Sequence, residues 1–259
     1  MSADLKTTFG FEQVDTAERR RRIRDLFDAI APRYDLMNDL MSFGIHRVWK
    51  RRFVRRVMAA LRTDMETGVA AEALAEPVID LAGGTGDIAR LLHKRGARNV
   101  VVMDASPAMM REGRAQPDTP RALHWVAAEG ERLPLPDDSV RAVTISFGLR
   151  NMSDPDAALR EIHRVLMPGG HLFCLEFSRP QWWLKPFYDL YSFFVIPRLG
   201  AMVAGHPRAY RYLVESIRRF PGQKALTEKI HAAGFNDVSW RNLSFGIAAI
   251  HHARKGTAA

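Results

Sequence analysis

The chain is poor in cysteine, with Cys174 the only one among its 259 residues. A single thiol excludes an internal disulfide and any metal site built from several cysteines, and we assign no metal ligands. Cys174 lies in the apolar run LFCLEF. That position favours a buried core thiol over a nucleophile.

Long apolar runs are also absent. No stretch approaches the roughly 18 consecutive apolar residues needed to cross a bilayer, and the opening MSADLKTTFG lacks the apolar segment of a signal peptide. The sequence contains no low-complexity linker and no internal repeat. We therefore expect a cytoplasmic protein with one large α/β domain and an appended arm.

Acidic residues are outnumbered, with 29 Asp and Glu against 38 Lys and Arg. The basic excess is concentrated in ERRRRIR (18–24) and HRVWKRRFVRRVM (46–58). In the second segment an apolar residue recurs every fourth position, at Trp49, Phe53, Val57 and Leu61. This spacing predicts a basic helix with one apolar stripe. Its basic face would meet water or a ligand, and among ligands an anionic membrane surface is favoured over nucleic acid.

Strand and helix signals alternate from residue 78 onward, which indicates a mostly parallel sheet covered by helices on both faces. The predicted strands cover residues 77–81, 99–103, 122–127, 142–147 and 171–177, and the predicted helices cover 87–95, 107–115 and 155–166. After Gly169-Gly170 the pattern predicts two helices, at 209–219 and 223–233. They are followed by a predicted hairpin of two strands with its turn around 244–246.

The segment before residue 70 has only helical signals. We expect a disordered tail at 1–17, a helical arm at 18–70 that packs over the carboxyl ends of the strands, and the main domain at 71–259. Ligands of open α/β sheets bind at those carboxyl ends, beside the first strand.

The nonapeptide DLAGGTGDI, residues 80–88, joins a predicted strand to a predicted helix. Gly84, Gly86 and Ala89 satisfy a loose dinucleotide fingerprint. However, Asp80 and Asp87 flank the loop, and each would repel a phosphate by about 1–4 kcal/mol at short range. A cationic ligand without phosphate, such as S-adenosylmethionine, fits better. Asp80 would then neutralise the ammonium group, although Asp87 is equally explained as a helix cap.

Further ligand contacts are predicted at the other strand ends. Thr85 would bind the carboxylate tail of the ligand, and Asp104, which ends the second predicted strand, fits ribose hydroxyls. Asp104 would do the same for NAD, so it does not discriminate between these cofactors. The pair Glu129-Gly130 lies where an adenine edge is expected, and Ser146 ends the fourth predicted strand.

The segment TISFGLRNMSD (144–154) indicates the type of methyl acceptor. It lacks the Asn/Asp-Pro-Pro-aromatic turn of many amine methyltransferases. Covalent attack on cytosine would require a cysteine outside the core. Arg150 and Asn151 instead offer a fixed cation and an amide, which suit a developing oxyanion.

Six segments in the same order resemble the UbiE/COQ5 family of C-methyltransferases in ubiquinone and menaquinone biosynthesis. They are YDLMNDLMSFGIHRVWK, DLAGGTGDIA, SFGLRNMSD, EIHRVLMPGGHLFCLEFSRP, YRYLVESIRRFPGQ and GIAAIHHARK. The match runs from about residue 23 to 255, nearly the whole chain. The resemblance implies a class I methyltransferase fold with a seven-stranded sheet, S-adenosylmethionine as cofactor and a polyprenylated benzoquinol or naphthoquinol as acceptor.

The resemblance also implies cofactor contacts at Thr85, Asp104, Glu129-Gly130 and Ser146. Glu129 departs from the Asn or Asp, followed by Ala, that the family pattern leads us to expect. In the first segment Tyr34, Asn38 and His46 are candidates for binding the quinol head. His46 is alternatively a general base, since its side chain titrates near neutrality, or a structural residue.

A hydroquinol carbon becomes nucleophilic when a neighbouring hydroxyl, with a pKa of about 10, gives up its proton. We assign stabilisation of that oxygen to Arg150 and Asn151, with Arg150 orienting a water that takes the proton. Arg itself stays protonated. A salt bridge from Arg150 to Asp154 is the structural alternative.

The aromatic-rich segment at 182–205 follows the fifth predicted strand, and its charges and prolines exclude a spanning helix. We interpret it as a flap at the membrane surface that receives the isoprenoid tail, with a homodimer contact as the alternative. Two other functions stay open, namely an RNA methyltransferase that uses the basic arm and an inactive lipid-binding subunit of a quinone-synthesis complex.

Overall fold

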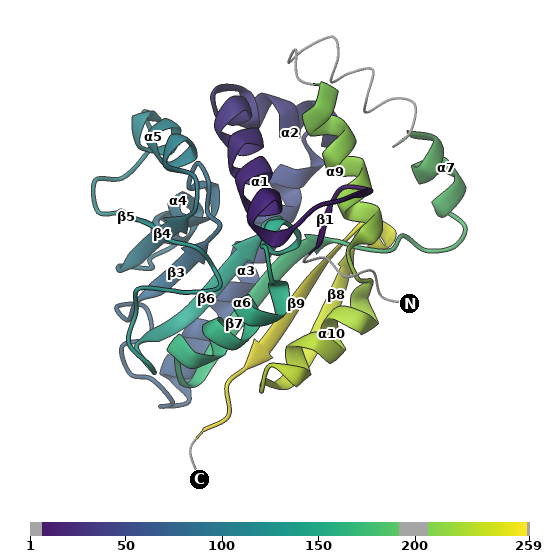
Figure 1. Cartoon of the computed structure of the whole chain (residues 1–259). Helices are drawn as coiled ribbons and strands as arrows, with labels where there is room; N and C mark the ends of the chain where they lie inside the picture. The colour runs from purple at the N-terminus through teal and green to yellow at the C-terminus, as the bar shows by residue number, and fades with distance from the viewer. Residues whose placement is uncertain (1–6, 192–206, 258–259) are drawn as a thin grey trace.

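A seven-stranded sheet forms the centre of the molecule (Figure 1). The computed structural model describes residues 7–191 and 207–257. The strands of this sheet are Val78–Leu81 (β3), Val100–Asp104 (β4), His124–Ala127 (β5), Val140–Ser146 (β6), Leu166–Phe177 (β7), Asn236–Leu243 (β8) and Ala248–Arg254 (β9). Across the sheet they lie in the order β5, β4, β3, β6, β7, β9, β8.

The five strands from β3 to β7 are parallel, whereas β9 runs antiparallel to both β7 and β8. This confirms the predicted parallel sheet with a terminal antiparallel hairpin, whose turn lies at Ser244–Gly246. β7 begins earlier than predicted because Leu166 pairs with Val140 ahead of a register shift.

Helices cover both faces and the carboxyl end of the sheet. They are Thr16–Ile30 (α1), Tyr34–Ser42 (α2), Ile45–Glu66 (α3), Asp87–Lys94 (α4), Pro107–Ala115 (α5), Pro155–Val165 (α6), Lys185–Leu190 (α7), Pro207–Arg219 (α9) and Gln223–Ala232 (α10). The predicted helices are confirmed to within two residues at each end.

Strand side chains alternate between two hydrophobic layers, as expected from the two-residue period of a strand. In β7, Phe173 and Leu175 join the layer beneath α3 and α4. Leu172 and Cys174 join the opposite layer, beneath α6 and α10. Cys174 is fully buried, which confirms the expected core thiol, and burial raises its pKa well above the usual value.

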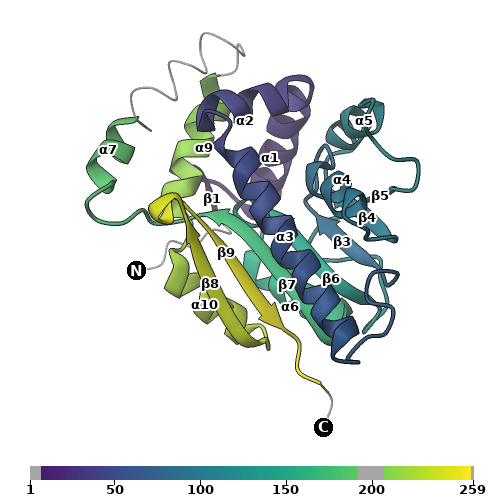
Figure 2. The ribbon, with the colours of Figure 1, turned by 180° about the vertical axis from the view of Figure 1, so that it is seen from behind.

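The basic arm divides between two positions. α1 and α2 lie at the carboxyl end of the strands, as expected, but α3 crosses one face of the sheet (Figures 1 and 2). Its predicted apolar stripe, from Trp49 to Leu61, is buried in the layer shared with α4. α3 is therefore part of the main core, and of the predicted arm only α1 and α2 cover the carboxyl ends of the strands.

The segment expected to be a disordered tail contains ordered structure from residue 7 onward. Thr8–Phe9 (β1) and Glu12–Gln13 (β2) form a two-stranded ribbon, and α1 begins at Thr16 with Asp15 as its cap. The ribbon is held by buried Arg19, whose Nε donates to the carbonyl of Thr8 at 2.8 Å.

The predicted flap lies partly outside the described residues. Its first part contains exposed Trp182 and Trp183 and the short helix α7, while 192–206 are not described. Among the described ranges, no helix combines the length and apolar content that a membrane span requires.

A buried polar cluster fastens α3 to the amino end of the sheet. Asp64 of α3 is paired with Arg141 of β6, and His171 Nε2 of β7 lies 2.8 Å from Asp64 Oδ2. His171 Nδ1 in turn lies 2.9 Å from Nε2 of His252 in β9. Desolvation by burial, followed by the nearby charges of His171 and Arg56, lowers the pKa of His252 to about 4.

This cluster predicts a loss of stability in acid. The pKa of His252 is lower in the folded chain than in the unfolded one, so folding favours the neutral ring. The resulting part of the free energy of unfolding is present above pH 6.5 and is lost as the pH falls toward 4. The loss should reach about 3 kcal/mol. In urea unfolding at a series of pH values, His252→Gln should show a shallower decline than the unaltered chain.

His124→Gln is the matched control because His124 is exposed. It should leave the pH dependence unchanged. Parallel curves for the unaltered chain and His252→Gln would show that His252 is not the responsible group.

Candidate active site

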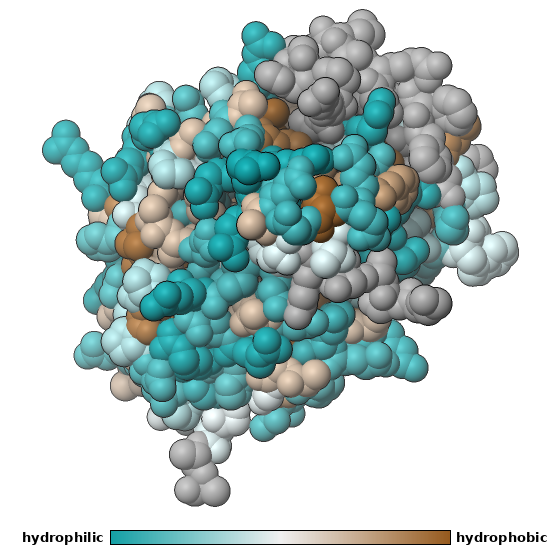
Figure 3. Space-filling model, in the orientation of Figure 1, coloured by the Kyte–Doolittle hydropathy of each residue, from teal (hydrophilic) through white to brown (hydrophobic). Residues whose placement is uncertain are grey.

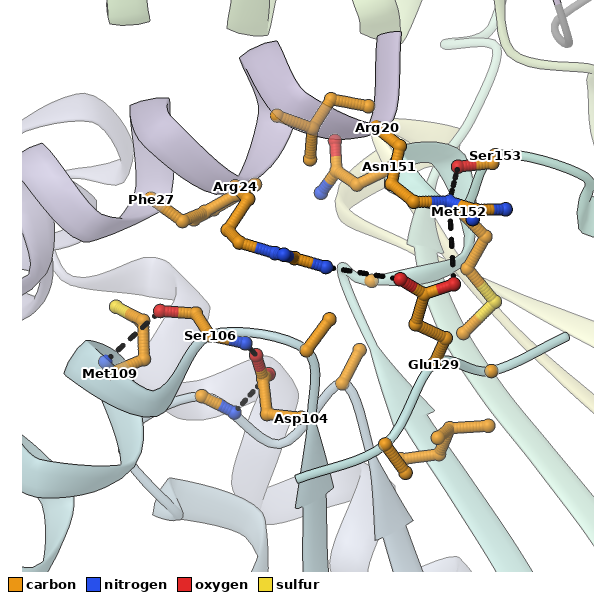
Figure 4. Close-up of a pocket in the computed structure, with 18 of the residues that line it drawn as sticks. Arg20, Arg24, Phe27, Asp104, Ser106, Met109, Glu129, Asn151, Met152 and Ser153 are labelled. Carbon is orange, nitrogen blue, oxygen red and sulfur yellow. Dashed lines mark hydrogen bonds and ion pairs between the residues drawn. The ribbon is translucent and has the colours of Figure 1, made fainter. Parts of the chain in front are cut away.

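A cavity opens at the carboxyl ends of β3 and β6, where the strand order reverses (Figure 4). This is the position at which open α/β sheets bind ligands. Strand-end loops form its floor and α1 forms its roof. It is lined by several of the predicted cofactor residues, namely Gly84, Asp104, Glu129, Gly130 and Ser146.

The carboxylate of Asp104 organises two of these loops. Its Oδ2 accepts the N–H of Gly84 and its Oδ1 accepts the N–H of Ser106, each at 2.8 Å. Burial raises the pKa of Asp104 above its usual value, and the two amide donors offset only part of this rise. Gly84 has a φ of +56°, which glycine adopts without strain. The carboxylate thus fixes the glycine loop as well as facing the cavity.

Three other predicted cofactor residues lie behind the cavity wall. Asp80 accepts hydrogen bonds from the Thr144 hydroxyl (3.0 Å) and the Ala89 N–H (3.2 Å). Its burial raises its pKa to about 7. Buried Thr85 donates to Asp35, and Gly86 caps α4. A Cβ on Gly86 would lie 2.7 Å from the indole of Trp125, so this glycine is required by packing.

Contrary to expectation, Asp87 carries no unpaired charge that would repel a phosphate, because its carboxylate binds Lys50 of α3 at 2.7 Å and also binds Arg90. It lies in the first turn of α4 and is not the cap. Lys50 is buried rather than facing solvent. The long-range contact from the arm could not be read from the loop sequence.

Arginines of α1 reach across the cavity to Glu129. Glu129 Oε2 lies 3.3 Å from Arg20 Nε, and Glu129 Oε1 lies 3.0 Å from Arg24 Nη2. Figure 4 shows both contacts. Asp28 of α1 also accepts a hydrogen bond from Ser106. The arm is thereby joined to the loops that follow β4 and β5. The carboxylate expected to meet adenine is occupied by arm arginines in this structure.

A second, more apolar cavity of about 560 Å³ lies beside the first. Tyr34, Asn38, His46 and Arg150, all predicted from the sequence, line it, and Asn151 lines the first cavity. Its apolar wall comes from α1, α2, α9 and the β8–β9 turn. The two cavities share three lining residues, Phe27, Tyr34 and Phe147.

The carbonyl of Phe147 holds the predicted Arg150-Asn151 pair. Arg150 Nη1 and Asn151 Nδ2 both donate to this oxygen, the latter at 3.3 Å. Arg150 Nη1 also binds Glu176 Oε1 at 2.6 Å. Glu176 replaces the expected partner Asp154, which instead caps α6 through the N–H groups of 156 and 157.

His46 is paired with an acid that the sequence did not single out. Its Nε2 lies 2.8 Å from Asp39 Oδ1, and its buried Nδ1 has no hydrogen-bond partner among the described residues. Burial lowers the pKa of His46, and the Lys50 charge lowers it further. The imidazole is therefore largely neutral at neutral pH. A neutral ring that donates through Nε2 leaves Nδ1 as a proton acceptor.

The sequence likeness spans the chain. A model described as the ubiE/COQ5 methyltransferase family matches residues 14–255. The chain belongs to this family.

Relatives and solved structures agree with this assignment. The ubiquinone/menaquinone biosynthesis C-methyltransferase UbiE of Rubrivivax gelatinosus is 54% identical over 98% of this chain and 95% of its own. UbiE of Acidiphilium cryptum is 45% identical over 94% of each chain. A chain from the complex of the Haloferax volcanii Trm112 methyltransferase activator with a methyltransferase superposes with a TM-score of 0.61. It is 19% identical, covering 92% of this chain and 99% of that one, and shows the class I methyltransferase fold.

The cofactor of this ubiE/COQ5 family member is S-adenosylmethionine. The first cavity suits it, because it joins carboxylates and backbone groups for hydroxyls with the apolar side chain of Met109. Ser146 Oγ is buried at its wall without a partner among the described residues. Asp104 and Ser146 would hold the adenosine half, and Asp80 would act indirectly by fixing the backbone of Ala89 behind the glycine loop. The Glu129 carboxylate is engaged by Arg20 and Arg24.

Glu176, Tyr212 and Asp39 are site residues that the sequence reasoning missed. Glu176 left a signal, since it is the lone acid in the apolar run LFCLEF. The sequence gives no such signal for Tyr212 and Asp39, because neither their residue types nor their spacing indicates that they contact Asn151 and His46.

Asp104→Asn should weaken cofactor binding. An amide would place an N–H₂ group against one of the two backbone donors, which removes at least one charge-assisted hydrogen bond. The amide also lacks the charge that would accept the ribose hydroxyls, and loss of a charge-assisted hydrogen bond of about 1.5–3 kcal/mol corresponds to a rise in Kd of about tenfold or more in titration calorimetry. Asp237→Asn, on exposed β8 away from the cavity, is the control and should bind normally. Equal affinity of both variants would contradict the assigned role.

Proposed function

We propose that the chain transfers a methyl group from S-adenosylmethionine to a ring carbon of a polyprenylated benzoquinol or naphthoquinol. The observation that carries the proposal is the pair of adjoining cavities, the second more apolar than the first, that meet at Phe147 beside Arg150 and Asn151. Relatives that share about half of the residues carry the name of this C-methyltransferase.

The bound cofactor supplies an electrophilic methyl group on a sulfonium. The chain's own task is to make the quinol carbon nucleophilic by stabilising the neighbouring oxygen as it loses its proton. Arg150 and Asn151 suit this role because one carbonyl holds both of them in place. Fixed donors in a buried site stabilise an oxyanion without reorganising.

His46 is the proposed proton acceptor, directly or through a water that Arg150 orients. Asp39 fixes the ring, and the lowered pKa keeps it unprotonated at neutral pH. Tyr34 and Asn38 lie on the same cavity wall and would bind the quinol head. Ile30 and Met37, both buried, offer apolar contact to the ring and the first part of the tail.

Arg150→Ala should lower kcat by about 100- to 1,000-fold, as expected for loss of an oxyanion donor. The Kd of the cofactor should not change, since Arg150 lines only the quinol cavity. Transfer of a labelled methyl group to each demethylated quinol measures kcat and also identifies the preferred ring.

Arg160→Ala, on the exposed face of α6, is the control for a lost arginine. It should transfer methyl groups at the normal rate. An Arg150→Ala variant that is as active as Arg160→Ala would refute this mechanism.

We further propose that the mouth of the quinol cavity lies on an anionic membrane surface. Phe43, which lines that cavity, is 78% exposed, and Ile45 and Val48 beside it are also exposed. Arg51 and Arg52 lie one turn farther along α3 and are exposed as well. Apolar side chains bordered by cations suit a bilayer with acidic headgroups. On the face seen in Figure 3, by contrast, apolar residues form only small patches within a hydrophilic surface.

Phe43→Ser should weaken co-sedimentation with vesicles that contain phosphatidylglycerol by about tenfold or more, since burial of one Phe contributes about 1.5–3 kcal/mol. Phe11→Ser is the matched control, because Phe11 is 51% exposed on the amino-terminal ribbon. Equal binding by the two variants would contradict this surface. A dimer in solution that Phe43→Ser dissociates would favour the homodimer alternative.

A further inference from the structure

Glu176 lies at the end of β7 with its carboxylate completely buried. Oε1 is 2.6 Å from Arg150 Nη1, whereas Oε2 has no hydrogen-bond partner among the described residues. The guanidinium of Arg150 also lies over the ring of Phe177, 5.3 Å from its centroid. Glu176 lines neither cavity. Its carboxylate therefore meets Arg150 from the side away from the quinol.

Tyr212 of α9 holds Asn151 and, unlike Glu176, also lines the quinol cavity. Its hydroxyl donates to Asn151 Oδ1 at 3.1 Å, while Asn151 Nδ2 donates to Phe147. A carbonyl only accepts, so the two partners together define which end of the amide is which. The Tyr212 ring is stacked on Phe9 with centroids 4.4 Å apart. Burial raises the pKa of Tyr212, so its hydroxyl keeps the proton it donates.

We propose that Glu176 and Tyr212 are positioning residues for methyl transfer, with Glu176 holding the guanidinium of Arg150 and Tyr212 holding the amide of Asn151. The proposal rests on the quinol methyltransferase function given above. Glu176 lines neither cavity and acts through Arg150, whereas Tyr212 lines the quinol cavity and acts on the reaction through Asn151. An unrestrained arginine would sample several rotamers, and only a fraction of them would face the quinol oxygen.

Glu176→Gln and Tyr212→Phe test the two contacts with little change in shape. Each should lower kcat by about tenfold. Glu176→Gln should leave the KM for S-adenosylmethionine unchanged, because neither Glu176 nor Arg150 lines the cofactor cavity. In an Arg150→Ala background, Glu176→Gln should cause no further loss. Likewise, Tyr212→Phe should cause none in an Asn151→Ala background.

A readout without cofactor or substrate is provided by ¹⁵N NMR of the arginine side chains. Rotation of the Arg150 guanidinium should be slow in the unaltered chain and faster in Glu176→Gln. The matched control is Asp64→Asn, which removes a buried carboxylate paired with Arg141 at the opposite end of the sheet. It should cost stability but leave kcat and the Arg150 signal unchanged.

Full kcat in both Glu176→Gln and Tyr212→Phe would overturn the proposal, as would losses that add in the Arg150→Ala and Asn151→Ala backgrounds. Tyr212→Phe retains the ring and all charges, so it tests the claim even where Glu176→Gln does not fold. If either of these outcomes is found while Arg150→Ala is inactive, the positioning roles are refuted but the proposed methyltransferase function is retained. Absence of methyl transfer by the unaltered chain would instead overturn the proposed function itself.

Discussion

The backbone of Phe147 is the constraint on which the site depends. Directly after β6 this residue adopts a left-handed conformation, with a φ of +58°, which costs a side chain of this size about 1 kcal/mol or more. The turn directs its carbonyl to Arg150 and Asn151 and its ring to the boundary of both cavities. Gly148 follows it, and a Cβ there would collide with Ala82 in the loop after β3. The two loops at the switch in strand order thus meet where only glycine fits.

The arginine-rich arm shows that one run of charge serves two purposes. In α1, Arg19 is buried and donates to backbone carbonyls of the ribbon and of Arg150, while Arg20 and Arg24 reach Glu129. In α3, Lys50 is buried against Asp87. The remaining arginines of α3 point mostly to solvent on the side away from the apolar stripe. Part of the positive charge of the arm therefore compensates carboxylates of the main domain, and the rest faces solvent.

What the sequence could predict follows from which interactions are local. Alternation of strand and helix signals, and polar residues at strand ends, depend on neighbours in the chain, so the parallel sheet with its hairpin and the cavity residues Gly84, Asp104 and Ser146 were accessible. The partners of Asp87 and Arg150 were not, because Lys50 and Glu176 come from elements far along the chain. The same holds for Asp80, whose burial depends on Thr144 of the neighbouring strand.

The contact between Gly86 and Trp125 gives a packing explanation for one glycine of the dinucleotide-like fingerprint. Gly113 of α5 presses on the same indole, where a Cβ would lie 2.6 Å away. Gly86, directly before α4, and Gly113, within α5, thus leave room for one large side chain on β5. Gly86 also has a φ of +80°, and a Cβ on Gly113 would lie 2.5 Å from the carbonyl oxygen of Thr85, so a smaller residue at position 125 would not by itself admit a side chain at either glycine.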